Sequence, residues 1–239
     1  MTADDMARAR RVLMRRDPVL ASVIRQHGPC GLKTARESDI FSGLLQAIVS
    51  QQLSTKAAAT IYGRLRALLP GETPTPDAIV PLSDEALRGA GLSRQKLGYV
   101  RDLSQKMLDG SINVASLTGL TDDEIVAELT QIKGIGRWTV EMLLIFRLAR
   151  PDVFPAGDLG IVKAIQKAYN LRGTPNVKRL HAIADRWRPY RSVASWYLWA
   201  SLTKSQGARR EAGSQGRLKR ARRKAGSQGN SKGARQSRK

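Results

Sequence analysis

The stretch IKGIGRWTVEMLLIF, residues 132–146, places two glycines on either side of one isoleucine, directly before a run with helical spacing. Glycine tolerates positive φ and lets a partner approach the backbone closely. The first N–H groups of the following helix lack acceptors within that helix and carry the positive end of its dipole, so a phosphate suits this place. Lys133 and Arg137 flank the turn. An ordinary corner between helices, with Gly134 as a C-cap and Ile135 in the core, explains the same residues.

Helical periodicity continues on both sides of this stretch. TDDEIVAELTQI begins with Thr121, a good N-cap, and this helix predicts a helical hairpin over about 121–149. SDIFSGLLQAIVSQQLSTKAAATIYGRLRALLP is long for one helix, so we expect two helices that meet at residues 50–54. No segment alternates apolar and polar residues for long enough to be a convincing strand. The sequence therefore predicts an all-α domain over residues 1–203.

The charge of the chain indicates a polyanionic partner. Its 239 residues carry a net charge of +21, and residues 204–239 hold 13 Lys and Arg against one acidic residue. This tail repeats AGSQG and has hardly any apolar residues, so it is predicted to be disordered. A solubilising role would explain it. Binding of DNA or RNA without sequence preference is favoured, because residues 1–203 are basic as well.

Several classes of protein are excluded by composition. No apolar run reaches the roughly 18 residues that a membrane span needs, and the N-terminus has no secretory pattern. The single cysteine, Cys30, cannot form an internal disulfide or a four-cysteine zinc or iron–sulfur site. We therefore expect a cytoplasmic chain, nucleoid-associated if it is bacterial. No apolar face is left over, so we expect a monomer without membrane contact.

Four blocks in order resemble the helix–hairpin–helix DNA glycosylases, and among them the alkylation-repair branch of 3-methyladenine DNA glycosylase II. The blocks are LLQAIVSQQLSTKAAATIYGRL, GLSRQKLGYVRDLS, LTQIKGIGRWTVEMLLIF and DVFPAGDLGIVKAI. This resemblance spans roughly residues 10–203 and implies a two-lobed fold, an active cleft between the lobes, and double-stranded DNA with damaged bases as the partner. It also suggests a monovalent cation at the hairpin carbonyls. The residues ahead of Phe41 read as helical, so the β-rich domain of some relatives is expected to be missing.

The resemblance implies that Asp158, in FPAGDLGIVKA, is the catalytic residue. A nearby anion stabilises the oxocarbenium-like state of a breaking sugar–base bond and can orient or deprotonate water. From local sequence alone, an N-cap of the following helix is the better reading of this aspartate. Glu141 is the reserve candidate, although surface charge or a pocket wall explains it more simply.

Trp138 stands where relatives that also cut the DNA backbone carry a nucleophilic lysine. The implied enzyme is therefore monofunctional and leaves an abasic site. An indole can stack on an electron-poor, flipped base, and the resemblance implies Trp199 as a second wall of the base pocket. Both indoles could instead be core residues. Met142 takes a position where relatives can carry an aromatic side chain, so the base preference stays open.

The SQQLST turn falls where the family inserts a side chain into the gap left by the flipped nucleotide. The resemblance places the wedge at Gln52 with Leu53 beside it, whereas a polar turn between helices is the ordinary reading. Arg94 and Lys96 resemble further phosphate contacts, and a solvated helix start explains them almost as well. The predicted DNA-contacting set is Gln51, Gln52, Leu53, Arg94, Lys96, Lys133, Gly134, Ile135, Gly136 and Arg137. Two rivals remain: a glycosylase for oxidised or mismatched bases, and a DNA-binding protein without enzymatic activity.

Overall fold

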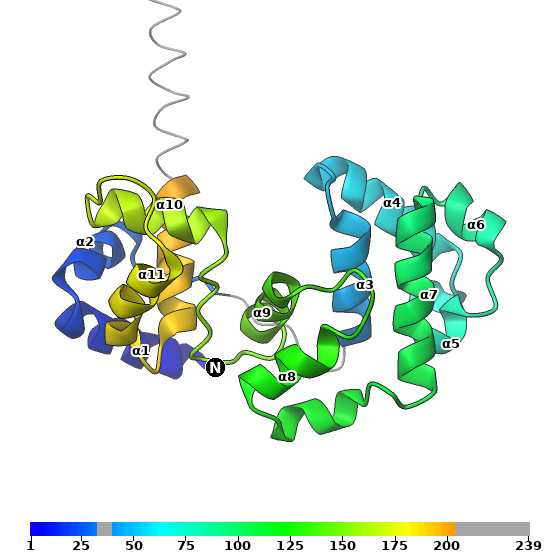
Figure 1. Ribbon diagram of the computed structural model, residues 1–239, viewed down its shortest axis with the longest axis horizontal. Helices are drawn as coiled ribbons and strands as arrows, with labels where there is room; N and C mark the ends of the chain where they lie inside the picture. Colours follow the sequence, from blue (N-terminus) through cyan, green and yellow to red (C-terminus); the bar gives the residue numbers. More distant parts are fainter. Residues whose placement is uncertain (33–39, 204–239) are drawn as a thin grey trace, which may run out of the picture.

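The computed structural model describes residues 1–32 and 40–203 (Figure 1). Within these ranges the regular elements are all helical, which confirms the predicted all-α class. None of the helices found there has the length and apolar character needed to cross a membrane. The basic tail that was predicted to be disordered, residues 204–239, lies outside the described part of the chain.

The elements follow one another along the chain as helices joined by short turns. The α-helices are α1 (Ala3–Arg16), α2 (Pro18–His27), α3 (Ile40–Ser50), α4 (Thr55–Ala67), α5 (Pro76–Ile79), α6 (Asp84–Gly89), α7 (Arg94–Leu108), α8 (Asp122–Leu129), α9 (Arg137–Phe146), α10 (Leu159–Ala168) and α11 (Val177–Ala184). Short 3₁₀ turns are η2 (Pro70–Glu72), η3 (Val114–Gly119) and η4 (Asp185–Trp187). A further helix covers residues 191–203.

Capping residues set the helix boundaries that the sequence predicted. The Thr121 hydroxyl accepts the Glu124 N–H, and the Glu124 carboxylate accepts the Thr121 N–H, so α8 begins with a complete capping box. Ser54 caps α4 through the Ala57 N–H. The two helices expected to meet at residues 50–54 do so, because α3 ends at Ser50 and α4 begins at Thr55.

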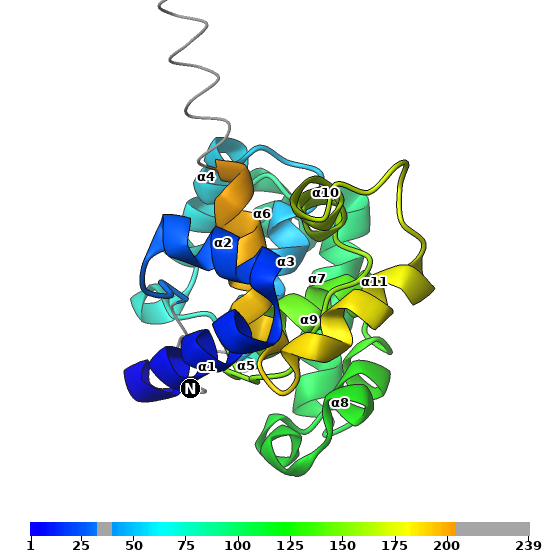
Figure 2. The same cartoon turned by 90° about the vertical axis from the view of Figure 1, so that its left-hand side faces the viewer.

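Two hydrophobic cores divide the helices into two lobes. The first core contains residues from each of the helices α3 through α9, and it buries side chains such as Leu44 and Ile145. The second joins α1 and α2 to α10, α11 and the terminal helix, and buries residues such as Leu20 and Tyr197. Figure 1 shows α9 between the two groups of helices, and Figure 2 views the lobe that the chain's first helices share with its last ones. The predicted two-lobed arrangement is therefore present.

A buried carboxylate closes the second lobe. Asp17 has no exposed surface and caps α2 by accepting the N–H groups of Val19 and Leu20. Its other oxygen accepts the Tyr169 hydroxyl and, at 2.9 Å, the Trp187 indole N–H. Four donors therefore satisfy this buried charge, and they tie the N-terminal helices to the C-terminal ones.

Candidate active site

The hairpin between α8 and α9 has the backbone that the glycines predicted. Gly134 has φ +81°, and an added Cβ there would overlap the Tyr99 ring. Gly136 is the N-cap of α9 and supplies no side-chain cap, so the first amides of that helix are left for an outside acceptor. The Ile135 side chain is only 4% exposed, so it packs in the core. Its backbone N–H donates to the Ile132 carbonyl at 3.0 Å, so neither the side chain nor this N–H is directed at DNA in this structure.

Asp102 on α7 binds the loop of the hairpin. Its Oδ2 accepts the Lys133 backbone N–H at 2.8 Å and the Lys106 ammonium at 3.0 Å. Lys106 Nζ also donates to the Gln131 carbonyl at 2.6 Å. Burial acts to raise the pKa of Asp102, but these hydrogen bonds outweigh it and hold the pKa below its ordinary value.

Asp102→Asn is expected to lower the stability of the protein by about 1.5–3 kcal/mol at neutral pH, because hydrogen bonds to a charged group are lost. Since folding lowers the pKa of Asp102, its contribution is complete above the unfolded pKa of about 3.9 and is lost as the pH falls through the lower folded value. Urea unfolding of both proteins at pH 7 and near pH 3 checks this. If the difference in unfolding free energy between the natural protein and Asp102→Asn does not shrink in acid, the charge-based explanation is contradicted.

Asp158 begins α10 and also binds both predicted tryptophans. Its Oδ1 accepts the Ile161 N–H at 2.8 Å and the Trp199 indole N–H at 2.9 Å. Its Oδ2 accepts the Trp138 indole N–H at 2.8 Å. The N-cap prediction is therefore confirmed, and the two indole N–H groups hold the same carboxylate in one orientation. The side chain remains partly exposed beside the half-exposed Trp138.

Gly160 makes room for this arrangement. A Cβ there would lie 2.9 Å from Asp158 Oδ1 and 3.2 Å from Trp199 Cδ1. Gly160→Ala is therefore expected to displace the carboxylate or the indole and to slow the reaction of this site by about ten- to a hundredfold, as small misplacements of catalytic groups do. Gly157→Ala, three residues earlier and just ahead of α10, is the control, because a Cβ there meets nothing within 4 Å. Single-turnover rates of the reaction at this site, measured for both variants, check this prediction. Equal rates for Gly160→Ala and Gly157→Ala would contradict the steric argument.

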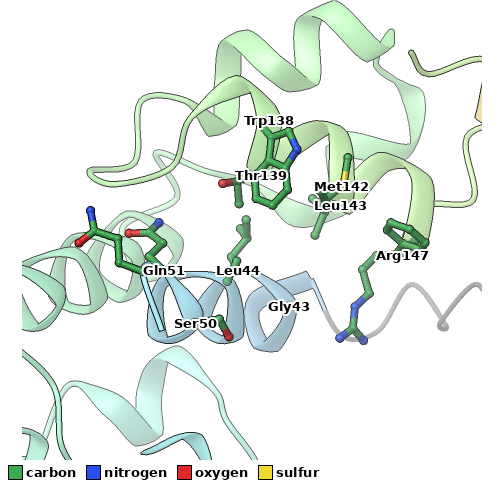
Figure 3. A pocket seen from close by; sticks show the side chains of 12 residues that line it. Gly43, Leu44, Ser50, Gln51, Trp138, Thr139, Met142, Leu143 and Arg147 are labelled. Atoms are coloured by element: carbon green, nitrogen blue, oxygen red, sulfur yellow. The ribbon is translucent and has the colours of Figure 1, made fainter. Parts of the chain in front are cut away.

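A cavity of about 370 Å³ opens between α3 and α9. Figure 3 shows Trp138, Thr139, Met142 and Leu143 of α9 facing α3. The cavity lining is largely apolar and includes Gly43, Leu44, Ala47, Ser50, Gln51, Gln52, Trp138, Thr139, Met142, Leu143, Phe146 and Arg147. The structure thus brings together Trp138 and Met142, the two predicted pocket residues on α9, with the turn that follows α3.

Trp199 differs from its predicted place as a wall of the same pocket. It stacks on Phe146, with ring centroids 5.7 Å apart and planes 28° from parallel, and it is absent from the lining of the α3–α9 cavity. Instead it borders a second hollow with Trp196, Ala200 and Phe146. In this structure it contacts Phe146, a residue of the cavity lining, and donates its indole N–H to Asp158.

Glu141, the reserve candidate, is neither on the surface nor part of the cavity lining. It is 8% exposed and lies 3.7 Å from the Arg137 guanidinium. Burial raises the pKa of Glu141, although Arg137 opposes the rise. The Arg137 side chain is 62% exposed and also approaches Asp123 at 3.4 Å, so its guanidinium stays at the surface near the start of α9.

The turn between α3 and α4 supplies the remaining predicted DNA contacts. Gln51 and Gln52 line the cavity, and Leu53 is 39% exposed beside them. Arg94 is exposed at the first position of α7. Lys96 points inward, because its ammonium donates to backbone carbonyls of the turn. Burial lowers the pKa of Lys96. Its predicted phosphate contact is therefore replaced by an internal one.

Two positioning residues escaped the sequence analysis. Asp102 reads as one more charge on an amphipathic helix, and nothing near it in the sequence shows that it meets the Lys133 N–H. Gly160 sits in the first turn of a helix, where a glycine ordinarily lowers stability, and this was a usable signal of close packing. It lies two residues after Asp158, so the resemblance could have drawn attention to it.

The helical hairpin and the carboxylate at the start of the next helix lie within one continuous stretch that can be compared with known protein families. A family model of the HhH-GPD superfamily of base excision DNA repair proteins matches residues 45–189. The chain belongs to this superfamily.

Relatives within it resemble the chain over most of its length. A DNA-3-methyladenine glycosylase of Schizosaccharomyces pombe is 36% identical over 169 residues, which are 70% of this chain and 74% of that one. The structure of an S. pombe 3-methyladenine DNA glycosylase with abasic DNA has a TM-score of 0.72 and 33% identity, covering 80% of this chain and 95% of that one. A DNA-3-methyladenine glycosidase structure from Bacillus halodurans also has a TM-score of 0.72, with 37% identity, covering 80% and 86%.

Proposed function

We propose that the chain is a DNA glycosylase of base excision repair that flips alkylated bases such as 3-methyladenine out of duplex DNA and releases them by hydrolysis. The observation that carries this is Asp158, whose two oxygens accept the indole N–H of Trp199 and that of Trp138, which lines the α3–α9 cavity. The names of the relatives and the complex of one with abasic DNA support the substrate class. We therefore expect the chain in the compartment that holds the DNA of the cell.

The reaction begins with a flipped base entering the cavity. The half-exposed indole of Trp138 offers a face on which a cationic, alkylated purine stacks, and Met142 and Leu143 continue that wall. An alkylated purine already carries positive charge, so it leaves well without a second carboxylic acid to protonate it. The base pocket therefore needs an aromatic wall more than it needs an acid.

Asp158 acts on the sugar. As the bond between C1′ and the base nitrogen breaks, its electron pair goes to the base, and the carboxylate stabilises the positive charge that develops on the sugar. Water then adds to C1′, and its proton passes to Asp158 or to solvent. The indole N–H bonds of Trp138 and Trp199 keep the carboxylate in one orientation for this step.

The product is an intact strand with an abasic site. Trp138 takes the place of the lysine whose amine would attack the sugar in a bifunctional enzyme. The neighbouring Lys133 cannot substitute for that lysine, because its ammonium lies near Asp102, at 3.8 Å, on the α7 side of the hairpin. Strand cleavage by a Schiff base therefore has no nucleophile at this position.

The monovalent cation that the resemblance suggested at the hairpin carbonyls stays a prediction. Three of these carbonyls accept a hydrogen bond within the protein, and each carbonyl oxygen keeps a second lone pair. The acceptors and donors are Gln131 with Lys106 Nζ, Ile132 with the Ile135 N–H, and Gly134 with Gln51 Nε2. The Lys106 ammonium also places positive charge beside the loop.

Base release from methylated duplex DNA tests the proposal. Free 3-methyladenine should appear in solution, and the strands should break only after treatment with alkali. Borohydride should trap no covalent complex between protein and DNA, since no Schiff base forms. Release of a base from otherwise identical duplexes that contain an oxidised or mismatched base, with no release from methylated DNA, would reject the alkylation class. Strand breaks without alkali would reject the monofunctional mechanism.

A further inference from the structure

The end of α3 is closed by a side chain from another helix. Lys96 Nζ donates to the carbonyl of Val49 at 2.6 Å and to that of Gln51 at 2.8 Å. The last carbonyls of a helix lack partners within it and form its negative end, so an ammonium stabilises them well. Lys96 thus fixes the point where the chain leaves α3 and enters the turn.

The turn itself has a backbone that its neighbours must maintain. Gln52 has φ +57°, a left-handed conformation that is uncommon for a residue with a side chain. Such a conformation costs free energy and persists only where the surrounding structure holds it. The carbonyl of the preceding residue, Gln51, is one of the two that Lys96 binds. Gln52 and Leu53 are thereby presented outward at the rim of the cavity.

The same turn is also linked to the hairpin. Gln51 Nε2 donates to the Gly134 carbonyl at 2.7 Å, which joins residues far apart in the sequence. Three residues of α7, spaced three apart and therefore close to one face of the helix, contact the turn or the hairpin. Lys96 contacts the turn, Tyr99 underlies Gly134, and Asp102 binds the Lys133 N–H.

We propose that Lys96 is a positioning residue that holds the α3–α4 turn in its inserting conformation, and that Gln51 fastens this turn to the hairpin so that both engage DNA as one unit. This inference rests on the proposed function, because it assumes that the turn enters the gap left by a flipped base. It assigns Lys96 a different role from the exposed Arg94, only two residues away on the same helix. Arg94 binds a phosphate directly, whereas Lys96 acts through the turn.

Salt dependence separates these two roles. Each lysine or arginine that neutralises a phosphate adds about 0.9 to the slope of log affinity against log salt concentration. A residue that positions the turn contributes nothing to this slope, but it determines how completely the turn enters the duplex. Insertion is measured independently of catalysis by the fluorescence of a 2-aminopurine placed beside a tetrahydrofuran abasic site, with protein at saturation.

The experiment compares Lys96→Met with Arg94→Met in the full chain. Lys96→Met should keep the salt slope of the natural protein and lower the 2-aminopurine signal or its rate of appearance by about tenfold, as expected for lost hydrogen bonds from a charged group. Arg94→Met should lower the slope by about 1 and keep the saturated signal. The basic tail contributes equally to every variant, so it cancels in the comparison.

If Lys96→Met lowers the salt slope by about 1 and keeps the 2-aminopurine signal of the natural protein, Lys96 contacts a phosphate directly. That result would overturn the proposal. Unchanged slope and unchanged signal would overturn it as well. If Lys96→Met does not fold, Lys96→Gln decides the matter, because glutamine keeps a donor and loses the charge. Positioning predicts an unchanged slope and a largely retained signal for that variant, whereas a phosphate contact predicts the lower slope.

The fastening role of Gln51 is tested by a double-mutant cycle. Gln51→Met and Lys96→Met should be non-additive in their effects on insertion, because both act on one turn. Additive effects would reject the single unit. A natural protein that inserts into the duplex but releases no base would refute the proposed function and leave the Lys96 assignment standing. A natural protein that binds no DNA would refute both.

Discussion

Asp158→Asn is expected to slow single-turnover base release by about 10²–10³-fold, the range found when one preorganised group that stabilises transition-state charge is removed. Asparagine caps helices as well as aspartate does, so the Ile161 N–H keeps its acceptor and α10 should form normally. What is lost is the negative charge near the sugar, together with an acceptor for one of the two indole N–H groups. The variant should therefore bind damaged duplexes and fail to process them.

This substitution also separates the two interpretations of the aspartate. If Asp158 were only a cap, Asp158→Asn would leave the rate of base release unchanged. Thermal unfolding and binding to an abasic duplex are measured beside the rate. A slow variant with natural stability and natural binding supports catalysis by the carboxylate. A loss of rate that merely follows a loss of folded protein would contradict it.

Gly134→Ala is expected to destabilise the protein by about 2–5 kcal/mol, the sum of a left-handed backbone for a residue with a Cβ and an overpacked contact. The φ of +81° and the Tyr99 ring both oppose a side chain at this position. Because the hairpin would shift or open, binding to damaged and undamaged duplexes should weaken together. Urea unfolding gives the stability, and fluorescence anisotropy gives the two affinities.

Gly136→Ala is the matched control for this prediction. A Cβ at Gly136 meets nothing within 4 Å and its φ is −101°, so stability should stay close to that of the natural protein. DNA affinity should nevertheless fall by about tenfold, because the methyl group stands where a phosphate would approach the first amides of α9. Natural affinity in Gly136→Ala would remove this N-terminus from the DNA interface.

Local rules made much of the fold predictable. Thr121 and the interruption at residues 50–54 each mark a helix boundary by chemistry that acts within a few residues. The positive φ of Gly134 was predictable for the same reason, since it is a property of one residue, whereas Gly136 has a negative φ. The lobes were less accessible, because the packing of α1 and α2 against α10 and the terminal helix joins the two ends of the chain.

The candidate site was predictable in its residue types and only partly in its contacts. Asp158 and Trp138 were identified through the resemblance, and neither sequence spacing nor propensity shows that their side chains meet. Ile135 and Lys96 were expected to face DNA, yet one is buried and the other points to carbonyls of a different helix. The direction of a long side chain depends on acceptors that are distant in sequence, and local patterns carry no information about them.

The most direct test of the central claim is the release of free 3-methyladenine from a methylated duplex, measured in the same sample in which binding of the natural protein to that duplex is recorded. The account predicts that bound DNA loses 3-methyladenine and keeps intact strands until alkali is added. Full binding without release of any base would contradict it, and would mean that the hairpin and the cavity serve a protein that binds DNA without cleaving the bond between sugar and base.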